Sequence, residues 1–257
     1  MKKILGVLIL VSSLVFLAAC GDNDAENQVI NIGATAIPHA EILAQVAPIL
    51  EEQGYTLNII EFHDFTTPNI ALQHGDIDIN FFQHVPFLNN FNYNHETNLV
   101  PVFGVHFEPL RLFSLNYTDL SGIENATIAI PDDPTNESRA LLLLEDLGLI
   151  SSQGAYNPHN LTILPIAADL LARTLEDVDY AVINGNFALL GGVTHLAIDG
   201  AGEEVGSEAA TTFTNFIVVR HGYEENSAVL ALINAINSQY IRDFINNTYY
   251  GRVVPTF

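Results

Sequence analysis

The segment 131–140, which reads PDDPTNESRA, holds the residues best suited to bind a small anion. Asn136 and Arg139 are three residues apart at the start of an expected helix, so they share one face of it. The N-terminus of a helix presents free N–H groups and a positive dipole end, and a guanidinium can hold a carboxylate through two hydrogen bonds. The segment therefore predicts a carboxylate-binding site, although a surface arginine paired with Glu137 or Asp133 would have the same sequence.

Aromatic side chains are concentrated in the stretch before this segment. Phenylalanine and histidine crowd into about thirty residues, at Phe62, Phe65, Phe81, Phe82, Phe87, Phe91, His63 and His84. Some of these rings belong to a hydrophobic core. The run 81–86 (FFQHVP), however, mixes aromatic and polar side chains at the end of an expected strand, which is typical of an apolar pocket with a few oriented polar groups.

Two amides flank a glycine at Asn184-Gly185-Asn186, directly after an expected buried strand. This pattern favours hydrogen bonds to a small polar ligand, but a turn or a helix cap would use the same residues.

Motifs for catalysis and for metal binding are almost absent. His106 and Glu108 would lie on one face of a strand, as two ligands of a metal site do, but no HExxH motif or further histidine pair accompanies them. The sequence also contains no GxSxG, GxGxxG or Walker motif. We therefore expect no catalytic residue, no metal and no cofactor.

The charge composition excludes one class of partner. The chain has 8 Lys+Arg against 30 Asp+Glu, which gives a formal net charge of −22, so no basic stripe for nucleic acid can form. With 49% hydrophobic residues it is globular, and its one cysteine excludes a disulfide framework.

The N-terminus has the pattern of an export signal. Lys2 and Lys3 precede the apolar run 4–19, which is short for a permanent transmembrane helix. The run ends in Leu-Ala-Ala-Cys20, which matches the lipobox of bacterial lipoproteins. We expect a signal peptide at 1–19, lipidation of Cys20 and a tether at 20–28; the alternative is an ordinary signal peptide whose cysteine is incidental.

Strands and helices alternate along the rest of the chain. The strands are expected at 29–34, 56–62, 76–82, 99–107, 110–115, 127–131, 161–164, 180–183 and 213–220. The helices are expected at 38–53, 68–74, 84–94, 134–147, 167–175 and, as two helices, 227–249. Such alternation predicts an α/β fold with mostly parallel sheets flanked by helices. We expect one lobe at 29–108 and 225–257 and a second at 109–224, with the ligand beyond the carboxyl ends of the strands.

From Ile30 to its end, the chain resembles the MetQ/NlpA family of lipoproteins, the substrate-binding components of methionine ABC transporters. The resemblance rests on the stretches 33–43 (GATAIPHAEIL), 82–86 (FQHVP), 129–144 (AIPDDPTNESRALLLL), 181–186 (AVINGN) and 253–257 (VVPTF). It implies a two-lobed periplasmic-binding-protein fold (type 2-like) that closes on L-methionine.

The resemblance also implies the roles of nine residues. The side-chain pocket would be lined by Phe65, Phe82, His84 and Phe87. The ligand carboxylate would lie at Asn136 and Arg139, and the amino acid backbone would be held by Asn184, Asn186 and Asn215. The family usually has tyrosine at positions 65 and 87, so another amino acid or a short methionine-containing peptide is an alternative ligand.

The implied partners are the permease and ATPase subunits of an ABC transporter. The protein would be a monomer, held by its lipid anchor to the cell membrane and facing outside the cytoplasm. A secreted enzyme of amino-acid metabolism is the other function class, and a catalytic base or nucleophile facing the cleft would favour it.

Overall fold

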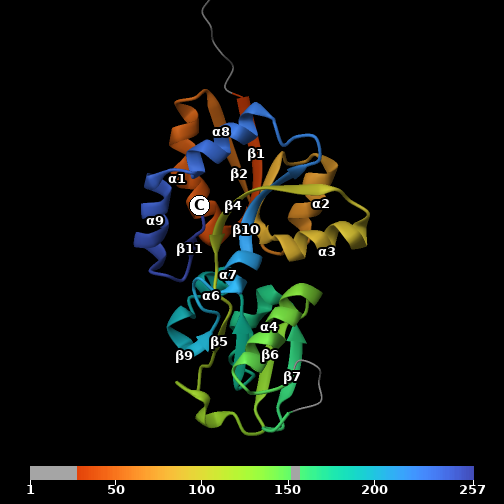
Figure 1. Cartoon of the computed structure of the whole chain (residues 1–257), viewed down its shortest axis with the longest axis vertical. Helices are drawn as coiled ribbons and strands as arrows, with labels where there is room; N and C mark the ends of the chain where they lie inside the picture. Colours follow the sequence, from red (N-terminus) through yellow and green to blue (C-terminus); the bar gives the residue numbers. More distant parts are fainter. Residues whose placement is uncertain (1–27, 152–156) are drawn as a thin grey trace, which may run out of the picture.

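The computed structural model describes residues 28–151 and 157–257, which form two lobes, one above the other in Figure 1. The signal peptide, Cys20 and the tether up to residue 27 lie outside the described residues. Within the described ranges, no helix is both long enough and apolar enough to cross a membrane.

The first lobe is built on a six-stranded sheet with the order β11-β4-β10-β3-β1-β2. Its strands are β1 (Gln28–Thr35), β2 (Tyr55–Phe62), β3 (Ile79–His84), β4 (Leu99–Phe107), β10 (Thr214–Arg220) and β11 (Val254–Pro255). Its helical segments are η1 (Ala36–Ala40), α1 (Glu41–Glu51), α2 (Thr67–His74), α3 (Val85–His95), α8 (Ser227–Ile236) and α9 (Gln239–Tyr249). Helices α1, α8 and α9 cover one face of the sheet, and α2 and α3 cover the other (Figure 1).

The second lobe has a five-stranded sheet with the order β7-β6-β8-β5-β9. Its strands are β5 (Arg111–Phe113), β6 (Thr127–Pro131), β7 (Thr162–Ile166), β8 (Tyr180–Ile183) and β9 (Ala197–Gly202). Its helices are α4 (Pro134–Asp146), α5 (Leu171–Thr174), α6 (Gly185–Leu190) and α7 (Glu208–Thr212), with short turns η2 (Leu120–Gly122), η3 (Ala168–Leu170) and η4 (Thr194–Leu196). Helix α4 packs on one face, and α5 and α6 pack on the other.

The central strands are buried because both of their faces are covered. All six residues of β3 and all four of β8 are buried, as expected for strands between two helical layers. Helix α1 buries Ile42, Leu43, Val46 and Leu50 at the predicted helical spacing. Helix α2 ends at Gly75, whose φ of 83° only glycine adopts at little cost.

The predicted elements are confirmed with shifts of a few residues at their ends, and β6 and β8 have the expected bounds. Sequence analysis missed the short strands β9 and β11, the short helices α6 and α7, and the turns η2 and η4. They span six residues or fewer, too few for a hydrophobic period to be recognised.

The two-lobed α/β arrangement is confirmed, but the expectation of mostly parallel sheets is wrong. Strand β1 pairs in parallel with β2 and β3, whereas β10 is antiparallel to both β3 and β4, and β11 is antiparallel to β4. In the second lobe, β6 pairs in parallel with β7 and β8, while β5 is antiparallel to β8 and β9. Antiparallel neighbours need no crossover helix, so the alternation of strands and helices does not reveal them.

The expected lobe boundary at 224 also needs correction, because β10 belongs to the first sheet. The strand lies between β3 and β4, and its residues Ile217, Val218 and Val219 are fully buried there. The chain therefore crosses between the lobes twice, at residues 108–110 after β4 and at Phe213 before β10. Strands β4 and β10, which adjoin the two crossings, lie side by side in the first lobe (Figure 1).

Candidate functional site

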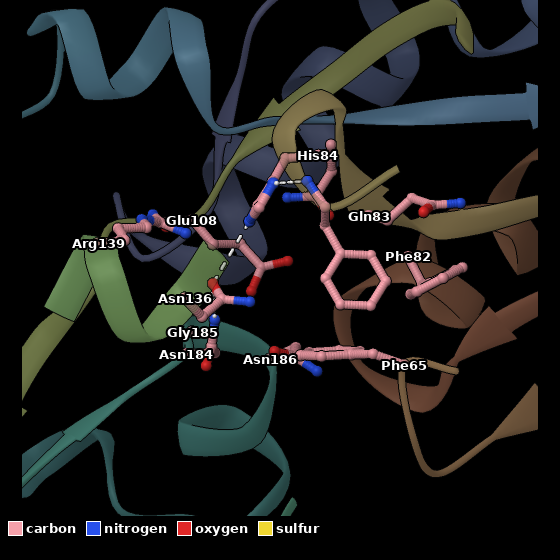
Figure 2. A pocket seen from close by; sticks show the side chains of 12 residues that line it. Phe65, Phe82, Gln83, His84, Glu108, Asn136, Arg139, Asn184, Gly185 and Asn186 are labelled. Carbon is pink, nitrogen blue, oxygen red and sulfur yellow. Dashed lines mark hydrogen bonds between the residues drawn. The ribbon is translucent and has the colours of Figure 1, made fainter. Parts of the chain in front are cut away.

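All nine predicted ligand-binding residues line one pocket between the two lobes. Three further residues, Gln83, Glu108 and Gly185, complete its lining. Figure 2 shows their side chains converging from the first lobe on one side and from the starts of α4 and α6 on the other. The structure thus brings the nine residues together, and their contact with a ligand stays a prediction.

The apolar wall of the pocket consists of three phenylalanine rings. Phe65 lies between β2 and α2, and its ring centroid is 5.9 Å from those of both Phe82 and Phe87. Phe187 of α6 packs on Phe65 from the second lobe at 4.9 Å. By contrast, Phe81 lies in the core on the other face of β3, so the core interpretation is correct for that ring.

His84 joins the aromatic wall to the polar wall. Its Nδ1 accepts the N–H of Phe87 at 3.2 Å, which caps helix α3, and its Nε2 is 3.3 Å from Oδ1 of Asn136. Because Nδ1 accepts, the proton must be on Nε2. Burial and, to a smaller extent, the positive charge of Arg139 lower the pKa of His84 to about 3, so the ring is neutral at physiological pH.

The polar wall begins at the predicted start of α4. Asp133 caps the helix by accepting the N–H of Asn136, and it also accepts from the side-chain amide of that residue. Oδ1 of Asn136 in turn accepts from Nδ2 of Asn184 at 2.9 Å. Oδ1 of Asn184 is buried and has no hydrogen-bond partner in the described parts of the chain.

Arg139 is buried, and its pairing partner is not one of those considered from sequence. Its Nε and Nη2 bind the two carboxylate oxygens of Glu203 at 2.7 and 2.5 Å. Nη2 also donates to the backbone oxygen of Glu108, and the guanidinium carbon lies 4.3 Å from the ring centre of Phe213. No hydrogen bond from Nη1 is found within residues 28–151 and 157–257, so this end remains able to bind a carboxylate.

Glu108 is the main pocket residue that sequence analysis did not place there. It lies on the first crossing between the lobes, and its Oε1 accepts from Nε2 of His106 at 2.8 Å. Burial raises the pKa of Glu108, an effect opposed by the N–H of Asn186, which donates to its carboxylate. The His106-Phe-Glu108 spacing was the available signal, but it suggested a metal site instead.

A second buried histidine completes this cluster. Nε2 of His39 lies 3.6 Å from Oε1 of Glu108 and 3.2 Å from Oδ1 of Asn215, and Nδ1 lies 2.7 Å from the hydroxyl of Thr35. Burial lowers the pKa values of His39 and His106 to about 3.

The residues with the best geometry for a metal ion are His39, His106 and Glu108, whose ligand atoms lie within 4.8 Å of one another. These groups already have hydrogen-bond partners, because Nε2 of His106 donates to Glu108 and the two ring nitrogens of His39 contact Thr35 and Asn215. We therefore interpret the cluster as a hydrogen-bonded support for Glu108.

The Arg139–Glu203 pair should contribute to stability as a coupled unit. Arg139→Met leaves a largely buried carboxylate unpaired, and we expect the free energy of unfolding to fall by about 3–5 kcal/mol. The double variant Arg139→Met/Glu203→Gln should lose clearly less than the sum of the single variants, as measured by urea denaturation. Arg173→Met, at an exposed arginine, is the control and should change stability by no more than about 0.5 kcal/mol. Additive losses would show that the pair is not coupled.

The neutral histidines should make the fold sensitive to acid. An unfolded histidine takes up a proton near pH 6.5, whereas folded His84 does so only near pH 3. The contribution of His84 to the free energy of unfolding is therefore complete above pH 6.5. It is lost as the pH falls toward 3, by about 1.4 kcal/mol per pH unit.

His84→Asn keeps a helix-capping side chain but does not titrate. Urea denaturation between pH 4 and 6 should therefore give a shallower pH dependence for His84→Asn than for the wild type. Equal slopes would mean that folded His84 titrates normally.

Comparison with known proteins identifies relatives over the whole described fold. The family model of the NlpA lipoprotein matches residues 30–257. The methionine-binding lipoprotein MetQ of Bacillus subtilis (strain 168) is 34% identical over 275 residues, which cover 99% of this chain and 99% of the relative.

Two solved structures have the same fold. A nutrient binding protein from Burkholderia cenocepacia bound to methionine superimposes with a TM-score of 0.82 at 33% identity, covering 89% of this chain and 100% of that chain. A periplasmic substrate-binding protein of an ABC transporter from Coxiella burnetii gives a TM-score of 0.81 at 31% identity, covering 88% and 100%.

These likenesses confirm the predicted two-lobed periplasmic-binding-protein fold and the resemblance found in the sequence. With a family match that begins within β1 and runs to the last residue, the chain belongs to the NlpA lipoprotein family.

Proposed function

We propose that this protein binds methionine in the pocket between its lobes and serves as the extracytoplasmic substrate-binding lipoprotein of an ABC importer. The observation that carries the proposal is the composition of the pocket, in which three phenylalanine rings face a group of buried amides and Arg139. A thioether packs favourably against aromatic rings, and amides with a guanidinium suit the polar end of an amino acid. The relatives named above are a methionine-binding lipoprotein, a protein bound to methionine and an ABC transporter component.

Each wall has a role in this proposal. Phe65, Phe82 and Phe87 would pack against the ligand side chain, and His84 would lie where the apolar and polar walls meet. Nη1 of Arg139 and the amides of Asn136 and Asn184 would bind the polar end, with Asn186 and Asn215 beside it. Because Phe65 and Phe87 carry no hydroxyl, the side-chain end of the pocket selects an apolar group, which another apolar amino acid or a short methionine-containing peptide would also supply.

Calorimetry of the full-length protein in detergent against the twenty amino acids tests the proposal. Methionine should bind with a single site and should raise the melting temperature, because a ligand at about 100 times its dissociation constant adds roughly 2.7 kcal/mol to the stability of the native state. Asn184→Ala should weaken methionine binding by about tenfold or more, the loss expected for one hydrogen bond in a buried site.

Asn89→Ala, at an exposed amide on α3, is the matched control and should bind methionine as the wild type does. Binding of a charged amino acid in preference to methionine would contradict the proposed ligand.

We further propose that Cys20 carries the lipid anchor, since the lipobox ends at this residue and the family is one of lipoproteins. Two or more acyl chains are needed for a stable anchor, because a single chain binds membranes only marginally. The tether would keep the two lobes near the membrane. There the protein, as a monomer, could deliver its ligand to the permease subunit of the transporter. The ATPase subunit would drive the transport.

Cys20→Ser should move the protein from the detergent phase to the aqueous phase in a phase-separation assay. Ser13→Ala, inside the apolar run of the signal, should still partition into detergent. A Cys20→Ser protein that remained lipidated would show that the anchor is attached elsewhere.

A further inference from the structure

Two charged side chains line the pocket, and only one of them has its charge balanced by a neighbour. Arg139 and Glu108 are the ionisable pocket residues besides neutral His84 among the lining residues in the described ranges. Both carboxylate oxygens of Glu203 bind Arg139, so this pair has no net charge. A ligand that met only Arg139 would leave Glu108 buried without a cation.

The groups that hold Glu108 are neutral. Its Oε1 accepts from His106, with His39 at 3.6 Å, and the N–H of Asn186 donates to the carboxylate. Burial lowers the pKa of both histidines to about 3, so neither carries a positive charge at physiological pH. A buried carboxylate needs hydrogen bonds and a charge partner to be stable. Burial raises the pKa of Glu108, and the nearby cation that opposes this rise, Arg139, is already paired with Glu203.

A second buried acceptor belongs to a residue of the pocket lining. Oδ1 of Asn184 is buried and lacks a donor within residues 28–151 and 157–257. The next residue, Gly185, is so close to Glu108 that a Cβ placed there would lie 2.8 Å from Oε2. Figure 2 shows the carboxylate of Glu108 within the ring of pocket side chains rather than turned away from it. The pocket lining thus contains the carboxylate of Glu108 and the unpartnered Oδ1 of Asn184, both of which are hydrogen-bond acceptors.

We propose that Glu108 binds the α-ammonium group of the ligand, and that it makes the pocket selective for free α-amino acids. This inference rests on the proposed function and assigns a specificity-determining residue to it. An ammonium group brings the missing positive charge, and its N–H bonds can donate to the carboxylate of Glu108. The ligand carboxylate then takes the Nη1 end of Arg139, and the side chain reaches the phenylalanine wall.

His39 and His106 act as positioning residues in this arrangement. Their rings support the carboxylate from behind without neutralising it. A lysine or arginine in either place would pair with Glu108 and remove the need for a ligand ammonium. Two buried neutral imidazoles keep the carboxylate oriented and leave its charge for the ligand.

A ligand series with the wild-type protein is the first test. Calorimetry compares methionine with its α-hydroxy analogue, 2-hydroxy-4-(methylthio)butanoate, and with N-acetylmethionine, both of which keep the thioether and the carboxylate. We expect each analogue to bind at least about 30-fold more weakly, the loss typical when one partner of a buried charged hydrogen bond is removed. Methionine and the α-hydroxy analogue binding equally well would overturn the assignment of an ammonium site, whereas absence of methionine binding would overturn the proposed function itself.

Glu108→Gln then separates a role in specificity from a role in folding. The variant keeps the size of the side chain and loses its charge, so affinity for methionine should fall by about 30-fold while affinity for the α-hydroxy analogue stays within about threefold. The preference for the amino acid should therefore largely disappear. Equal losses of affinity for both ligands, or no loss for either, would show that Glu108 does not bind the ammonium group.

Glu61→Gln removes an exposed glutamate of β2 and is the control for net charge. It should retain the wild-type preference for methionine. If Glu108→Gln does not fold, the wild-type ligand series alone decides the question.

Discussion

The guanidinium of Arg139 joins the second lobe to both chain crossings between the lobes. It binds Glu203 of its own lobe, donates to the backbone of Glu108 on the first crossing and stacks on Phe213 on the second crossing. One planar cation can make these contacts together because its donors lie in a fixed fork and its face accepts an aromatic ring. Both interlobe crossings are thereby held against the start of α4, and the pocket is formed where they meet.

The same interaction sets the electrostatics of the pocket. Because Glu203 neutralises Arg139, the cleft has no net positive charge, and the buried carboxylate of Glu108 becomes the charge that a ligand must balance. The three neutral histidines around this region serve as hydrogen-bonding groups without adding charge. A zwitterion suits such a site, since its ammonium group can pair with Glu108 while its carboxylate meets the Nη1 end of Arg139.

The mixed sheets follow from the way the chain passes between the lobes. Strand β10 returns from the second lobe and enters the first sheet antiparallel to β3 and β4, which places Asn215 beside the His39–Glu108 cluster. Strand β5 starts just after the first crossing and pairs antiparallel to β8, and Asn184 follows the end of β8. In each sheet, a strand next to a crossing between the lobes pairs with a strand that ends at the pocket. Asn184 and Asn215, which are far apart in the chain, therefore both line the pocket.

The sequence by itself determined which local elements form and which residues could bind an amino acid. The helix start at Asp133, the buried strand before Asn184 and the aromatic run ending at His84 are local patterns, because capping, burial and periodicity act over a few residues. The nine residues that the family resemblance implies for the site all line one pocket. The structure alone decided the partner of Arg139, the place of β10 and the entry of Glu108 into the pocket. Those features depend on contacts between residues such as Arg139 and Glu203, 64 positions apart, and no local pattern encodes which distant groups a folded chain brings within hydrogen-bonding distance.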